Sequence, residues 1–169
     1  MSNKFFRIVF FIFAAFLISD AQELPKLGNA ILGGKVSFTM PPGWKAYTKT
    51  DNEIEIENPA GDAFWKITAD IKEDFIFQTA LEFAQDTDAN LTKNLANKTP
   101  TNMSKVTLGG SEAYKNIVSG GYGSIVYTYH SVSSVYDKYF VHTLGWCKKS
   151  KFVENEAIYD KIVSSVKFK

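Results

Sequence analysis

Cysteine, histidine and arginine are nearly absent from this 169-residue sequence, and each shortage excludes a class of chemistry. The only cysteine, Cys147, excludes an intramolecular disulfide. Because it follows an apolar run, we expect a small buried hydrophobe rather than a reactive thiol. With only His130 and His142, any nucleophile that needs an imidazole base depends on one of the two. Arg7 is the only arginine, so we expect no nucleic-acid partner.

Neither sign of charge dominates, since 19 lysine and arginine residues stand against 18 aspartate and glutamate residues. A composition with 45% hydrophobic and 22% charged residues excludes intrinsic disorder, which requires few apolar side chains and a high net charge. The length suits one globular domain, for which we expect residues 33–169, preceded by a loose lead-in over 22–32.

Only the N-terminal segment contains a long apolar run, from residue 8 to residue 18. It follows a basic start and precedes small residues, so residues 1–21 have the three-part pattern of a secretory signal peptide, with cleavage expected after Ala21. An uncleaved anchor helix is the alternative, although the run is short for a bilayer span. No cysteine stands at the cut, so a lipoprotein is not expected. We therefore expect a periplasmic or secreted bacterial protein whose mature chain has no net charge and no membrane span.

Hydrophobic periodicity divides the remaining chain into strands and two helices. Strand patterns occupy 35–39, 44–47, 53–57, 63–72, 103–108, 112–118, 122–132 and 136–146. Helical patterns occupy 76–97 and a final segment from about residue 150. The first predicts a buried face of Phe77, Ala80, Leu81, Ala84, Leu91 and Leu95, and the second a shared face of Asn155, Ile158, Tyr159, Ile162, Val163 and Val166. We expect bends at Gly120-Gly121 and at Ser133-Ser134. This order predicts an α+β fold in which one antiparallel sheet is flanked by helices.

Two groups of residues suggest metal ligands, and spacing argues against both. Glu53, Glu55 and Glu57 alternate along one strand, where each step of two residues covers about 6.6 Å, so one calcium ion cannot easily bind all three. A bend at Ser134 would pair His130 with Lys138 and His142 with Val126. The two histidines would then lie about 13 Å apart along neighbouring strands, too far for a shared zinc. We therefore expect no metal and no cofactor, with the glutamates on a solvated sheet face or edge.

Catalytic motifs are equally scarce. The sequence contains no Gly-x-Ser-x-Gly and no phosphate-binding Gly-Lys-Ser/Thr, and its Gly-Gly pairs are expected to be turns. Asp86 and Asp88 lie two residues apart on the expected helix, so they face different directions and form no acid/base pair. We therefore expect a protein that is not an enzyme.

Aromatic side chains are abundant in and beside the expected strands. Tyr127 and Tyr129 share one strand face, and Trp44 and Tyr47 follow the Pro41-Pro42-Gly43 turn. A tyrosine-rich surface is typical of binding sites for proteins, peptides or glycans, so these four residues are the candidate partner-binding residues. Packing within the core and across strands explains the same pattern without any ligand.

Several segments resemble the PsbP-like family, over about residues 33–169. The likeness rests on the strand that ends in Met40-Pro41-Pro42-Gly43-Trp44, the helix over 76–97, the Gly109-Gly110 turn, two long aromatic strands and the closing helix into 162–168. It implies an α/β/α sandwich around a central antiparallel sheet. Members of the family are mostly non-enzymatic photosystem subunits, assembly factors, envelope proteins and a small-GTPase-binding import factor, so no catalytic residue carries over.

These observations together predict an exported, non-catalytic binding or assembly module of the bacterial envelope, whose partner is an envelope protein or a small ligand. The sequence has neither an organelle transit peptide nor a lipid-accepting cysteine, so metal or chloride retention at a photosystem is not implied. The alternative is a secreted hydrolase-type enzyme that uses His130 or His142 as its base.

Overall fold

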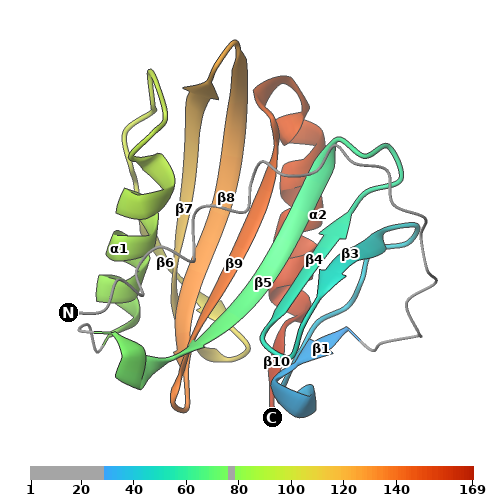
Figure 1. The fold of residues 1–169 in the computed structure, drawn as a ribbon, viewed down its shortest axis with the longest axis vertical. Helices are drawn as coiled ribbons and strands as arrows, with labels where there is room; N and C mark the ends of the chain where they lie inside the picture. The colour runs from blue at the N-terminus through green and yellow to red at the C-terminus, as the bar shows by residue number, and fades with distance from the viewer. Residues whose placement is uncertain (1–28, 76–78) are drawn as a thin grey trace.

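A computed structural model describes residues 29–75 and 79–169, so the expected signal peptide and most of the lead-in lie outside the described residues. The described chain forms a seven-stranded antiparallel sheet in the order β3-β4-β5-β9-β8-β7-β6 and a small three-stranded sheet in the order β1-β2-β10 (Figure 1). The strands are β1 Ala30–Ile31, β2 Val36–Ser37, β3 Lys45–Lys49, β4 Glu53–Glu57, β5 Ala63–Ile71, β6 Ser104–Leu108, β7 Ser111–Tyr122, β8 Ile125–Tyr136, β9 Tyr139–Lys148 and β10 Lys167–Phe168.

Two α-helices pack on opposite faces of the large sheet. Helix α1, Ala80–Thr92, lies against β7 and β8, and helix α2, Phe152–Ser165, contacts β9 and β8. In Figure 1, α2 lies behind the sheet. Three short 3-10 turns complete the described structure: Leu32–Gly34, Lys72–Asp74 and Lys149–Lys151. The fold is therefore α+β and mostly antiparallel sheet, as the sequence predicts. None of the described helices is long and apolar enough to cross a bilayer.

The main core lies between the sheet and α2. Strict alternation on β4 and β5 directs Ile54, Ile56, Trp65 and Ile67 to this side, where all four are buried. The face of α2 predicted from its helical period is confirmed, because Asn155, Tyr159, Ile162, Val163 and Val166 are buried and Ile158 packs against the same cluster. Cys147 is also buried in this core, as predicted.

Helix α1 is shorter than the 76–97 segment that its period predicts. Thr79 caps its N-terminus through a reciprocal pair of hydrogen bonds with Glu82, which fixes the first turn. The helical period places Leu81 on the buried face, but Leu81 is 37% exposed, and Phe83 is buried instead. Phe77 lies outside the described residues.

Both expected bends in the last strands are wrong. Gly120 and Gly121 lie inside β7, where a Cβ on Gly120 would stand 2.6 Å from the Leu95 side chain, so this glycine permits close packing rather than a turn. The bend falls instead at Gly123-Ser124, between β7 and β8.

Ser133 and Ser134 are buried within β8, and the next bend is at Asp137-Lys138, where Asp137 has a φ of +51°. This bend pairs His130 with Gly145 and His142 with Ser133, instead of the expected Lys138 and Val126. Gly145 and His142 are an odd number of residues apart, so the two histidines lie on opposite faces of the sheet.

Candidate functional site

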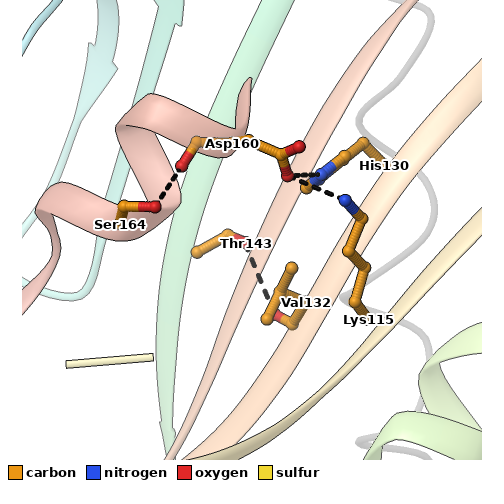
Figure 2. A network of polar contacts seen from close by, with 6 residues as sticks. All are labelled: Lys115, His130, Val132, Thr143, Asp160 and Ser164. Atoms are coloured by element: carbon orange, nitrogen blue, oxygen red, sulfur yellow. Dashed lines mark hydrogen bonds and ion pairs between the residues drawn. The ribbon is translucent and has the colours of Figure 1, made fainter. Parts of the chain in front are cut away.

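A polar cluster joins three elements beneath α2. Lys115 comes from β7, His130 from β8 and Asp160 from α2, and Figure 2 shows the first two converging on the Asp160 carboxylate. His130 Nε2 lies 2.9 Å and Lys115 Nζ 2.8 Å from the same Asp160 Oδ1. Beside the cluster is a depression of about 220 Å³ lined by Asn102, Ser104, Lys115 and Ile117.

The charges within this cluster follow from burial. Burial lowers the pKa of His130 and outweighs the hydrogen bond to Asp160, so the imidazole is neutral at neutral pH. A neutral imidazole that bonds a carboxylate must donate its Nε2–H, which leaves Nδ1 as a buried acceptor with no hydrogen-bond partner among the described residues. Burial alone would raise the pKa of Asp160, but the hydrogen bonds from Lys115 and His130 together lower it. The cluster is therefore an ion pair of Lys115 and Asp160 supported by a neutral histidine.

His142 makes a second polar pair on the α1 side of the sheet. Its Nε2 lies 3.0 Å from Ser131 Oγ, and the ring meets Phe83 edge-on at 6.3 Å. Burial, with a smaller effect of Lys66, lowers the pKa of His142 to about 3. This arrangement gives a hydroxyl and a neutral imidazole.

A catalytic set of nucleophile, base and carboxylate would need all three groups at one histidine, but here the carboxylate and the hydroxyl lie on opposite faces of the sheet. His130 has a carboxylate and His142 has a hydroxyl, and neither has both among the residues that the structure describes. No group of three His, Cys, Asp or Glu side chains in the described ranges could hold a metal ion. Burial also raises the pKa of the Cys147 thiol, which opposes thiolate formation.

His142 predicts a specific pH dependence of stability. The pKa of His142 is about 6.5 in the unfolded chain and about 3 in the folded one. Between these pH values the unfolded state therefore binds more protons than the folded state. We expect the free energy of unfolding to fall as pH drops from about 6.5, by up to about 1.4 kcal/mol per pH unit from this group. Urea titrations at several pH values would measure the slope. The substitution His142→Gln should flatten it, and an unchanged slope would show that other groups dominate.

The four candidate partner-binding residues do not share one surface. Trp44 is only 7% exposed and packs edge-on against Tyr159 in the main core, at a centroid distance of 6.4 Å. Tyr129 is buried with Val118 and Leu144 under α1, and Tyr127 packs against this cluster. Tyr47, on edge strand β3, is exposed. Contact of any of them with a partner stays a prediction, and Tyr47 and Tyr127 alone are accessible for it.

A further candidate surface is the part of the sheet that α1 does not cover. On the side that carries α1, the helix covers β7 and β8, while β4 and β5 have no described helix in front of them (Figure 1). Alternation and strand pairing place eight partly exposed side chains of β4, β5 and β9 there. We call this surface the open face: Glu53, Glu55, Glu57, Phe64, Lys66, Thr68, Asp70 and Trp146.

Charge and aromatic surface are combined on the open face. Phe64 and Trp146 stack with ring centroids 5.3 Å apart, and Lys66 Nζ lies 3.8 Å from Glu53 Oε2. Burial raises the pKa of both Glu55 and Asp70, with additional repulsion from Glu53, and Lys66 opposes the shift. The eight residues of the open face thus include four carboxylates and one lysine, and Lys45 of edge strand β3, which pairs with Glu57, lies on the same side of the sheet.

Sequence reasoning identified the glutamates of this surface and the two histidines, but missed most of their neighbours. Asp160 lies 30 residues from His130 and 45 from Lys115, so no local spacing connects them. Nothing in the sequence distinguishes a lysine and an aspartate that pair across separate elements from the other lysines and aspartates of the chain. The Phe64 and Trp146 pair depends in the same way on the pairing of β5 with β9.

Comparisons with known proteins identify solved structures of similar architecture. No family model and no curated protein matches the sequence. Among solved structures, LpqN of Mycobacterium tuberculosis, described as involved in cell envelope biogenesis, has a TM-score of 0.60 at 14% identity, covering 78% of this chain and 82% of that one.

Two further structures agree. The cyanobacterial PsbP of Synechocystis has a TM-score of 0.61 at 12% identity over 83% of this chain and 90% of that one. The Ran-binding protein Mog1p of Saccharomyces cerevisiae has a TM-score of 0.60 at 12% identity over 82% and 93%. Similarity at these identities concerns architecture alone, and it shows that this chain has a PsbP-like fold.

Proposed function

We propose that the chain is an exported, non-catalytic binding or assembly module of the bacterial envelope, and that its open face contacts a protein partner. The observation that carries the proposal is a sheet face with charged and aromatic side chains that no described helix covers. An accessible aromatic pair is typical of the centre of a protein interface, and charged side chains around it are typical of the polar rim. We also infer that the two helices and the sheet form the α/β/α sandwich that the family resemblance implies, incomplete over β4 and β5.

The chemistry of the open face indicates the kind of partner. Four carboxylates share the surface with Lys66 and adjoin Lys45, so acidic groups outnumber basic ones, and the raised pKa values of Glu55 and Asp70 reflect burial and then the crowding of like charges. A basic side chain from a partner would relieve this repulsion, and the stacked Phe64 and Trp146 would supply apolar contact. The partner therefore presents lysine or arginine beside an apolar group.

The neighbours in the comparisons support a binding role. The yeast protein is described as binding Ran, and the mycobacterial protein as acting in cell envelope biogenesis. Export is supported by the signal-like pattern over residues 1–21.

Charge reversal tests the proposal. Glu55→Lys should reduce the yield of the cross-linked partner from the native source by more than about ten-fold, since it replaces attraction of a basic group by repulsion. Glu154→Lys, a reversal on exposed α2, is the matched control and should leave the yield unchanged. Circular dichroism should show the same fold in both variants. Equal partner recovery with all three proteins would contradict the proposed surface.

The hydrolase alternative keeps one supporting observation, the 3.0 Å contact of Ser131 Oγ with His142 Nε2. Its test is a screen of ester and amide substrates with wild-type protein, Ser131→Ala and His142→Gln. Turnover that both substitutions abolish in a folded protein would replace the binding proposal with an enzymatic one.

A further inference from the structure

An apolar tip projects from the end of the sheet that lies farthest from the β8–β9 bend. It is formed by residues 122–126, where β7 turns into β8, and it is the outermost point of that end in Figure 1. Tyr122, Ile125 and Val126 are 47%, 39% and 44% exposed. Val153, in the first turn of α2 at the same end, is the most exposed large hydrophobic side chain of the described residues. We call these four side chains the hairpin tip.

The composition around the hairpin tip is unusual for an exposed hairpin. No Lys, Arg, Asp or Glu occurs between Lys115 and Asp137, so the tip has no charge of its own. Exposed turns and strand ends normally carry charged residues, which prevent association with other chains. A protruding apolar turn without them indicates a contact with an apolar medium.

Lysines flank the hairpin tip on both sides. Lys148 is paired with Tyr127, and Lys149 follows it in the 3-10 turn that contacts β8. On the other side, the bridge between Ala96 and Gly121 holds the segment after α1 against the hairpin, with Lys93 and Lys98 on either side of the bridge. None of these four lysines forms an ion pair with another described residue.

Acidic groups at this end are fewer than the lysines. Glu154 pairs with Lys151 at 3.1 Å, so these two charges offset each other. Glu154 raises the pKa of Lys151 most, and Asp62, from the turn between β4 and β5, also raises it. Glu156 lies three residues after Val153 on α2. The rim of the hairpin tip is therefore basic.

We propose that the hairpin tip inserts into the headgroup region of an anionic lipid surface while the flanking lysines contact the phosphate groups. Aliphatic side chains at the apex would enter the boundary with the acyl chains, and the Tyr122 ring suits the interface because it is apolar with a polar end. Lysines near an anionic surface each add electrostatic attraction that salt screens. None of the four side chains of the hairpin tip belongs to the open face, so either proposal can fail without the other.

A lipid surface fits these features better than a protein pocket does. The β7–β8 turn projects as the outermost part of this end (Figure 1), and the lysine-bearing segments lie beside both of its strands, after α1 next to β7 and at the end of β9 next to β8. A fluid surface accommodates a point of this shape without a preformed cavity. The lysines have no bidentate geometry, and the diffuse charge of lipid phosphates does not require it.

Vesicle binding tests the proposal with the processed, folded protein as its host exports it. Phosphatidylcholine vesicles that contain phosphatidylglycerol should bind wild-type protein at least about ten-fold more tightly than vesicles of phosphatidylcholine alone. Ile125→Ser/Val126→Ser should lose about ten-fold in binding, because apolar surface no longer enters the lipid. Lys148→Gln/Lys149→Gln should weaken binding by a similar factor and reduce its dependence on salt.

The opposite end of the sheet offers a matched control. Ile71 and Leu81 are 41% and 37% exposed, close to the values at the tip, and Ile71 pairs with Tyr139 beside the β8–β9 bend. Ile71→Ser/Leu81→Ser should bind vesicles like wild type. Equal binding of wild type and the tip variant, or no preference for anionic vesicles, would overturn the proposal. Capture of one protein by a cross-linker at position 125, without vesicle binding, would assign the tip to a protein partner instead.

Discussion

Replacing Trp44 with alanine is expected to lower the free energy of unfolding by about 3–5 kcal/mol, the usual cost of removing a large aromatic side chain from a core. Trp44 is 7% exposed, contacts the fully buried Tyr159 edge-on, and belongs to the main cluster between the sheet and α2. The indole therefore links the start of β3 to the helix on the far side of the core. Urea unfolding followed by circular dichroism would measure the loss.

Tyr47 is the matched control for this substitution. It lies three residues further along the chain and is 49% exposed, so Tyr47→Ala should change stability by less than about 0.5 kcal/mol. If Trp44→Ala left stability intact and instead abolished partner binding, the sequence-based assignment of Trp44 to a binding surface would hold and its packing role would be wrong.

The second large effect is expected at Gly145 on β9. A Cβ at this position would stand 2.8 Å from two ring carbons of Tyr159, which is itself fully buried and donates its hydroxyl hydrogen bond to the Trp146 carbonyl at 2.9 Å. The ring cannot move away without breaking that bond or disturbing Trp44. We expect Gly145→Ala to cost about 1–3 kcal/mol and Gly145→Val about 3 kcal/mol or more, because the core is overpacked.

Gly121 provides the comparison for Gly145. A Cβ there would meet the Ala96 carbonyl oxygen at 3.4 Å, an ordinary contact, so Gly121→Ala should be nearly neutral. Thermal unfolding of the three variants beside wild type would rank them. Equal midpoints for Gly145→Val and wild type would show that α2 can shift on the sheet, and the packing argument would fail.

Local patterns in the sequence correctly predicted the elements whose buried face follows from the spacing of their own apolar residues. Glu53 to Glu57 alternate strictly, and β4 has those bounds. The face of α2 is correct because each buried residue follows the helical period. The pair Gly120-Gly121 is typical of a turn, whereas Gly120 is in fact required by close contact with Leu95, which is distant in sequence.

The candidate site was harder to predict from the sequence, because it too depends on contacts between residues that are distant in the chain. The displaced bend moved the pairing of His130 from Lys138 to Gly145, which placed the two histidines on opposite faces of the sheet instead of the same face. Aromatic content in strands indicated either a surface or a core, and only packing distinguishes Trp44 from Tyr47. The open face arises because α1 covers part of one sheet face, and helix placement has no local sequence pattern.

The pairing of β2 with β10 has a consequence for the rate of folding. Val36 and Ser37 lie beside Phe168 and Lys167, and the Thr39 backbone amide bonds Ser165 Oγ across 126 residues of chain. The central pairing of β5 with β9 likewise spans α1 and three strands. Chains dominated by such distant contacts fold slowly, over milliseconds to seconds, because long loops must close before any contact compensates for the lost entropy. The β7–β8 hairpin is local, so we expect it to form early, while β10 joins last and completes the native state.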